Sequence, residues 1–267
     1  MAIECFKCLL VLTSCLATLI CFTLKFESWS FIPSYFRDHQ IYTRIVVDGN
    51  VTYSHENLWN GLYSSLYYAS AVTMLPLIDK AVIRLGSINL LLISLTFCTL
   101  TAVALAFVLG YWALLAFNTM QGAAAIVIDT CVNTIIAKQS CSLRERSLML
   151  GFLRGCEQTG VEIGPYVGGA LYAATGDKKW SFGAVTIACG IALVLMLWLA
   201  TDQAQRRRKT ATKRASEPDA TMFRASVPWC TILRDRSLMY CIGATTVATL
   251  TYNTTLPMIS VWLMVGE

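Results

Sequence analysis

Long apolar runs separated by polar segments recur along the whole chain, and they predict membrane-spanning helices. A helix needs about 20 largely apolar residues to cross the hydrocarbon core of a bilayer. We predict seven spans, at residues 8–24, 59–78, 88–109, 111–137, 147–173, 181–200 and 238–264. An interfacial segment through residue 33 extends the first span. The pattern predicts an all-α membrane protein.

The polar segments between these runs suggest how the chain is divided. Residues 34–57 form a first long polar loop, and residues 201–236 form a second one that contains the basic run Arg-Arg-Arg-Lys at 206–209. We therefore predict a six-helix half over residues 1–200, a basic cytoplasmic linker over 201–236, and the first helix of an incomplete second half over 237–267. The chain is expected to be truncated after this seventh helix.

Charge distribution sets the expected orientation. Only 14% of residues are charged and 56% are hydrophobic, whereas a soluble domain has about 25% charged residues. With a cytoplasmic N-terminus, fifteen lysines and arginines fall on the cytoplasmic side and five on the other, as the positive-inside rule requires. Asn50 then lies on the opposite side, where Asn50-Val51-Thr52 is a glycosylation acceptor. The basic linker has no interleaved aromatic residues, so nucleic acid is not an expected partner.

Cysteine and histidine placement argues against a disulfide framework, a metal site and an enzyme. All 11 cysteines fall in predicted helices or cytoplasmic segments, where disulfides are rare. Cys5-x-x-Cys8 has no second pair or histidines near it, so we expect no zinc and no other cofactor. His39 and His55 lie in the first external loop, away from the carboxylates within the membrane.

The fifth predicted helix combines glycine with charge. Gly160, Gly164 and Gly168 recur every four residues and are followed by Gly169, so they are expected to let a neighbouring helix approach closely. Pro165 predicts a kink, because proline removes a backbone N–H and clashes with the preceding turn. This packing motif is also compatible with an ordinary glycine-rich membrane helix.

Charged residues within the predicted spans are the candidates for chemistry, because a charge at mid-membrane depth costs about 2.5 to 3.5 kcal/mol or more. Asp129 and Arg154 lie at the same depth, about 10 to 12 Å from the cytoplasmic ends of their helices at 1.5 Å per residue. They are expected to pair, with Glu157 as an alternative partner. One arginine cannot neutralise three carboxylates, so Glu157 or Glu162 is a candidate proton carrier. Alternatively, one carboxylic acid stays protonated and only forms a structural hydrogen bond.

Uncharged polar residues in the second and fourth helices leave two interpretations open. Asn118 and Gln121 could bind substrate, although such residues more often form hydrogen bonds between helices. Tyr63, Tyr67 and Tyr68 could line a site for a cation through cation–π contacts or could simply pack.

Several of these runs resemble known families. Gly160-x-x-x-Gly164-Pro165-x-x-Gly168-Gly169 resembles the fifth-helix motif of proton-coupled antiporters in the major facilitator superfamily. Ile32-Pro33-Ser34-Tyr35, Met120-Gln121-Gly122 and Leu256-Pro257 are similar to runs in the vesicular amine and acetylcholine transporters. The resemblance implies a secondary transporter with alternating access, in a vesicle or plasma membrane.

The chain also departs from that family where its charges are expected. By alignment of the short runs, the amine-recognising aspartate of helix one falls on Cys21, the fourth-helix arginine on Asn118, and the seventh-helix glutamate on about Asn253. The motif between the second and third helices, which contributes to gating in the family, survives only as Arg84-Leu85-Gly86, with Asp79 near its first position.

The leading hypothesis is a proton-coupled antiporter of a small organic cation, such as a monoamine or an acetylcholine-like molecule. A non-transporting or truncated relative that acts as a membrane scaffold is the alternative. A seven-helix receptor is disfavoured, because the charge bias places the N-terminus in the cytoplasm and the last helix lacks an Asn-Pro-x-x-Tyr pattern.

Overall fold

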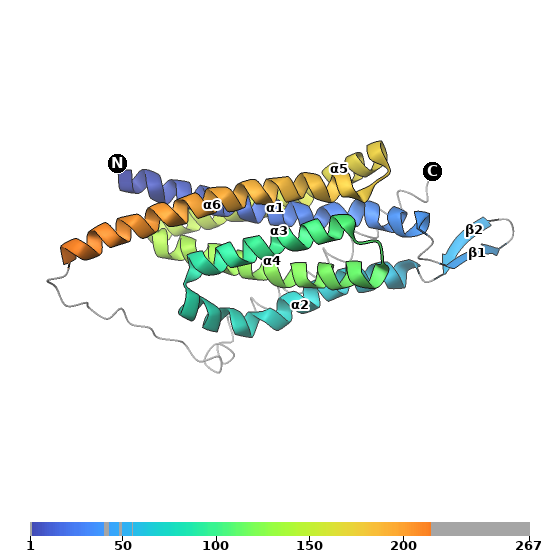
Figure 1. Ribbon diagram of the computed structural model, residues 1–267, viewed down its shortest axis with the longest axis horizontal. Coiled ribbons are helices and arrows are strands. Elements are labelled where there is room, and N and C mark those ends of the chain that lie inside the picture. Colours follow the sequence, from blue (N-terminus) through green and yellow to red (C-terminus); the bar gives the residue numbers. More distant parts are fainter. Residues whose placement is uncertain (1, 40–42, 48–49, 55, 215–267) are drawn as a thin grey trace. The chain divides into compact units, whose positions relative to one another are not determined.

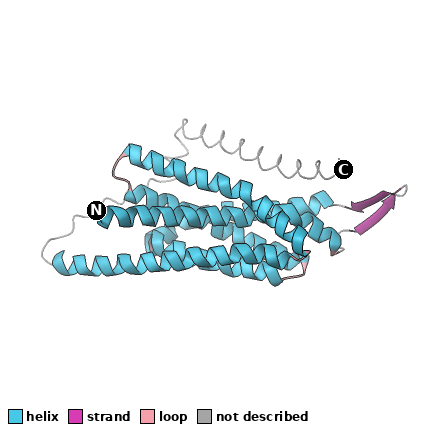
Figure 2. Ribbon diagram, turned by 90° about the horizontal axis from the view of Figure 1, so that it is seen from above, coloured by secondary structure: helices cyan, strands magenta, loops and turns pink. Residues whose placement is uncertain are grey.

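The computed structural model describes residues 2–39, 43–47, 50–54 and 56–214. The helices are α1 (Ala2–Asp38), α2 (Glu56–Leu85), α3 (Ser87–Phe107), α4 (Tyr111–Gln139), α5 (Leu143–Thr175) and α6 (Lys178–Arg214). They run alongside one another, and a short hairpin of β1 (Thr43–Val47) and β2 (Asn50–Ser54) lies beyond the helix ends (Figures 1 and 2). The hairpin is antiparallel, with Thr43 opposite Ser54. The chain divides into two compact units, Met1–Arg207 and Arg208–Glu267.

Helix boundaries differ most from the prediction at the ends of α1, α2 and α6, and α5 begins at Leu143, within the predicted loop. The first helix continues through Lys25 and Glu27 to Asp38, so these two charges lie within a candidate span instead of outside it. The second helix reaches Leu85 and includes Asp79, because a single glycine provides the reversal into α3. The sixth continues to Arg214, so the start of the predicted linker is helical. The predicted seventh helix lies outside the described residues.

Local sequence signals explain where the helices begin and end. Gly86 and Gly176 adopt φ values of 81° and 67°, a backbone region that glycine enters without a steric penalty. At the start of α5, the Ser142 hydroxyl accepts the Glu145 amide N–H at 3.2 Å, and the Glu145 carboxylate accepts the Cys141 amide N–H at 2.7 Å. Ser142 thus acts as the N-cap of α5, and Glu145 holds the preceding residue instead of the N-cap amide, so the arrangement is a variant of a capping box.

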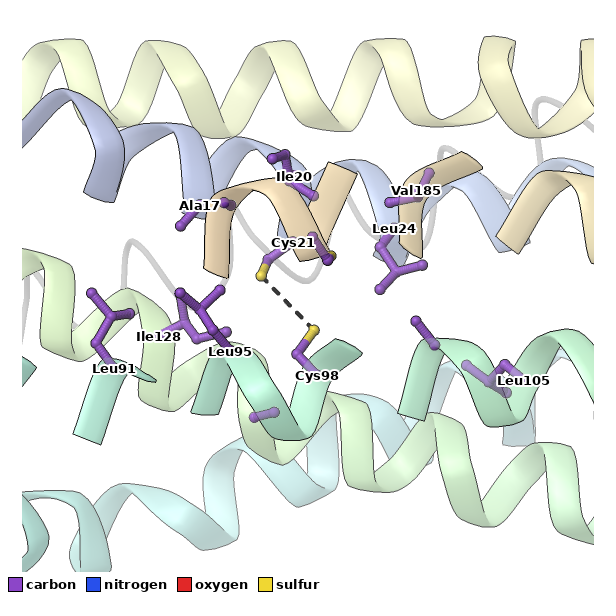
Figure 3. Packing of buried hydrophobic residues seen from close by; sticks show 14 of the residues in the cluster. Ala17, Ile20, Cys21, Leu24, Leu91, Leu95, Cys98, Leu105, Ile128 and Val185 are labelled. Carbon is purple, nitrogen blue, oxygen red and sulfur yellow. Dashed lines mark hydrogen bonds between the residues drawn. The ribbon is translucent and has the colours of Figure 1, made fainter. Parts of the chain in front are cut away.

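Helix pairs α1 with α5, α2 with α4 and α3 with α4 make the most extensive contacts within the first unit. Side chains from α1, α3, α4 and α6 meet in one buried cluster (Figure 3). In its centre the Cys21 and Cys98 sulfur atoms lie 3.9 Å apart as free thiols. Cys21 is therefore part of a buried packing contact between α1 and α3.

Five of the described helices are long and apolar enough to cross a membrane. The exception is α5, which carries the glycines and charges. Large apolar side chains remain exposed on α3 and α6, for example Leu100, Phe107, Ile187, Val194 and Trp198, as expected for surfaces in contact with lipid tails. The prediction of an all-α, multi-pass integral membrane protein is confirmed.

Candidate functional site

One face of α5 is built for backbone contact with α1. A methyl group added to Gly160 would lie 2.6 Å from the Leu19 carbonyl oxygen, and one added to Gly164 would lie 2.7 Å from the Thr23 carbonyl oxygen. At Gly168 the closest approach is 2.5 Å, to atoms of Glu27. Gly169 has more room, with Ser30 Oγ at 3.5 Å. Pro165 lies inside the helix.

The opposite face of α5 is polar. Arg154, Gln158, Glu162 and Tyr166 recur every four residues, and all four side chains are exposed, Tyr166 at 80%. Gln158 donates a hydrogen bond to Glu162 Oε1 at 3.3 Å. A face with two charges is costly against hydrocarbon, so this side of α5 requires water or protein beside it.

Arg154 belongs to a cluster of charged side chains that lies between α4 and α5. Its guanidinium donates a short hydrogen bond to Glu157 Oε2 and lies 3.7 Å from Asp129 Oδ1. Asn133, one turn along α4, donates to Asp129 Oδ1 at 2.9 Å. The structure therefore brings Asp129, Arg154 and Glu157 together, and both predicted pairings of Arg154 occur.

The members of this cluster differ in burial. Glu157 is only 7% exposed, and its second carboxylate oxygen has no hydrogen-bond partner in the described part of the chain. The Arg154 side chain is 58% exposed, so the pair is not fully buried. We therefore expect loss of Arg154 to cost less than the roughly 3 to 5 kcal/mol typical of breaking a buried pair.

Sequence reasoning missed two charges in α1. Glu27 is 0% exposed, and neither of its carboxylate oxygens has a partner among the described residues. Lys25 places its ammonium among aromatic rings of α1 and α2. The signal that would have found them is the apolar and aromatic sequence that resumes after Glu27. With these two included, acidic residues within the membrane still outnumber basic ones by two, Glu27, Asp129, Glu157 and Glu162 against Lys25 and Arg154.

Asn118 and Gln121 lie on the buried face of α4. Asn118 Nδ2 donates to the Tyr63 carbonyl oxygen of α2 at 2.8 Å, a hydrogen bond between helices. Gln121 is 3% exposed, and its side-chain nitrogen has no partner among the described residues. Asn118 therefore contributes a hydrogen bond to the contact between α2 and α4.

None of the contacts described for the cluster involves the remaining predicted residues. Asp79 and Arg84 are exposed on the last turns of α2, and Gly86 forms the turn after them. Asn50 begins β2 of the hairpin, and Asn253 lies outside the described residues. No group of three or more potential metal-binding side chains occurs in the part of the chain that the structure describes.

Membrane-length helices with a glycine-packed pair and a charge cluster between α4 and α5 define a multi-pass helical membrane protein. A family model described as Major Facilitator Superfamily matches residues 10–266, nearly the whole sequence, and the chain belongs to that superfamily. Its members are transporters that move small molecules across membranes and are not enzymes. No curated protein matches the sequence.

Proposed function

We propose that this chain is a proton-coupled antiporter that moves a small organic cation, such as a monoamine or an acetylcholine-like molecule, by alternating access. The six helices form one half of the transporter, residues 201–236 form the linker, and residues 237–267 begin the second half. The cluster of Asp129, Arg154 and Glu157 carries the proposal, because it holds two carboxylates against one guanidinium.

The excess negative charge of the cluster supplies a physical basis for exchange. A proton on Glu157 neutralises the excess, and so does an organic cation bound beside the two carboxylates. Since either one removes the charge that attracts the other, the two bind in competition. Protonation also releases Arg154 from Glu157 and leaves the guanidinium to Asp129, which is already 3.7 Å away. The polar face of α5 provides the wall along which the cation passes.

The distribution of lysine and arginine indicates which side of the membrane each loop faces. Because Lys25 lies inside the membrane, four basic residues remain on the non-cytoplasmic side: Arg37, Arg44, Lys178 and Lys179. The bias keeps its direction, so the hairpin and Asn50 face the lumen or the exterior. The location is a vesicle or plasma membrane.

The test is uptake of a labelled organic cation into proteoliposomes under an imposed pH gradient. Glu157→Gln keeps the shape of the side chain but cannot titrate. We expect it to abolish gradient-driven uptake. Because glutamine also lacks the negative charge that attracts the cation, exchange without a gradient should be weakened but partly retained. Glu162→Gln is the matched control, because Glu162 is exposed and contacts Gln158, and it should keep gradient-driven uptake.

Two results would contradict this function. Wild-type dependence on the pH gradient in Glu157→Gln would remove Glu157 as the proton carrier. Absence of both uptake and exchange in the wild-type protein would favour the scaffold interpretation over transport.

A further inference from the structure

The ammonium of Lys25 lies within cation–π range of four aromatic rings. Its Nζ is 4.3 Å from the ring centre of Tyr68, 4.5 Å from Phe26, 5.2 Å from Tyr67 and 5.5 Å from Phe22. Phe22 and Phe26 belong to α1, one turn before and directly after Lys25, and the two tyrosines belong to α2. We call these four rings the aromatic cage.

The rings are the main partners of this charge. No hydrogen bond or ion pair of the Lys25 ammonium occurs among the described residues, although the charge of Glu157 also acts on it. An ammonium ion removed from water needs compensation. Aromatic faces provide it, and they are the groups that proteins use to recognise organic ammonium ligands.

The walls of the cage are held by contacts that do not depend on Lys25. Phe26 is 3% exposed and Tyr67 is 7% exposed. The backbone of Tyr67 lies against Gly122 of α4 so closely that a methyl group there would collide with the Tyr67 carbonyl oxygen. Tyr67 and Tyr68 also pack edge to face, with ring centres 5.6 Å apart. The rings should therefore keep their places when the lysine side chain leaves.

Lysine differs from these rigid walls, because its charge sits on a flexible four-carbon stem. We propose that the aromatic cage is a binding site for a small organic ammonium ion, and that the Lys25 ammonium occupies it as a tethered competitor of that ligand. This inference rests on the proposed function for the identity of the transported cation. It adds the site that receives the cation and the side chain that must move away first.

Chemical rescue tests the site. Lys25→Ala removes a fragment equivalent to n-propylammonium, so this ion is the probe, and 1-propanol is its uncharged control. Binding is followed by thermal unfolding and tyrosine fluorescence of purified protein without a pH gradient. We expect Lys25→Ala to bind n-propylammonium at least about tenfold more tightly than wild type, and to respond little to the alcohol. Adding Tyr68→Leu should remove the gain.

Further variants separate a vacated cation site from a simple gap. Lys25→Met fills the cage with an uncharged chain and should show no gain. Equal binding by wild type and Lys25→Ala would overturn the proposal, as would an equal response to the alcohol and the ammonium. The gain should persist in a Glu157→Gln background, so failure of proton coupling and failure of the cage give different results.

A measurement on the wild-type protein covers the case in which Lys25→Ala does not fold. Tetramethylammonium cannot react with amine-directed reagents, so Lys25 labelling can be measured in its presence. Displacement of the lysine from the cage should raise its labelling rate at least severalfold at saturating tetramethylammonium. An unchanged or lower rate would refute the competition.

Discussion

Replacing Gly164 by alanine tests whether backbone contact between α1 and α5 holds this helix pair together. The added methyl group would lie 2.7 Å from the Thr23 carbonyl oxygen and 2.9 Å from the Glu27 amide nitrogen, where 3.4 to 4 Å is ordinary contact. Both atoms belong to the backbone of α1, so no side-chain rotation relieves the collision. One helix must move by several tenths of an ångström.

The cost follows from that movement. A gap of about 0.5 to 1 Å forfeits a quarter to a half of the dispersion energy of each affected contact. Overpacking of this kind typically costs about 1 to 3 kcal/mol. Alanine favours a helix over glycine by up to about 1 kcal/mol, so we expect a net loss of up to about 2 kcal/mol for Gly164→Ala. Gly164→Leu should lose more.

Two controls make the comparison specific. At Gly183 of α6 an added methyl group meets nothing within 4 Å, so Gly183→Ala should be neutral or slightly stabilising. Gly169 belongs to the same sequence motif as Gly164, yet its nearest neighbour is an ordinary 3.5 Å contact, and Gly169→Ala should be tolerated. Stability is measured by detergent-induced unfolding followed by tryptophan fluorescence. Equal loss in Gly164→Ala and Gly169→Ala would refute the role of backbone approach.

Two further predictions concern the regions outside the membrane. Asp177 caps α6 by accepting the Lys179 amide N–H at 3.0 Å, so Asp177→Ala should destabilise the protein by about 1 kcal/mol, whereas Asp177→Asn should keep most of the cap. That hydrogen bond lowers the pKa of the Asp177 carboxyl. The ionic stabilisation is therefore complete above the unfolded pKa of about 3.9 and is lost as pH falls through the lower folded pKa. Unfolding curves from about pH 6 down to about pH 2 would detect this loss. Glycosidase should increase the gel mobility of protein made in eukaryotic cells but not of Asn50→Gln, and unchanged wild-type mobility would contradict the proposed orientation.

Helices α1 to α4 and α6 could be predicted as membrane spans because their apolar runs are long and carry few charges. Helix α5 is too polar to qualify by composition, and the predicted seventh span lies outside the described residues. The depth of a residue below the membrane surface could also be predicted, because the rise per residue in a helix is fixed. It placed Asp129 and Arg154 at one level, and the structure has their side chains 3.7 Å apart. The predicted end of α1 was wrong, because hydropathy averaged along the sequence drops at Lys25 and places the edge of the span there.

Partners across helices could not be predicted, because spacing along a helix defines a face but not its neighbour. The glycine face of α5 contacts α1, and this contact surrounds Glu27, whose carboxylate oxygens have no partner among the described residues. A fully buried carboxyl is costly in its charged form unless it is paired or hydrogen-bonded. The close contact between α1 and α5 therefore encloses an acidic group, and only knowledge of the neighbouring helix, which spacing along α1 does not give, could have shown this.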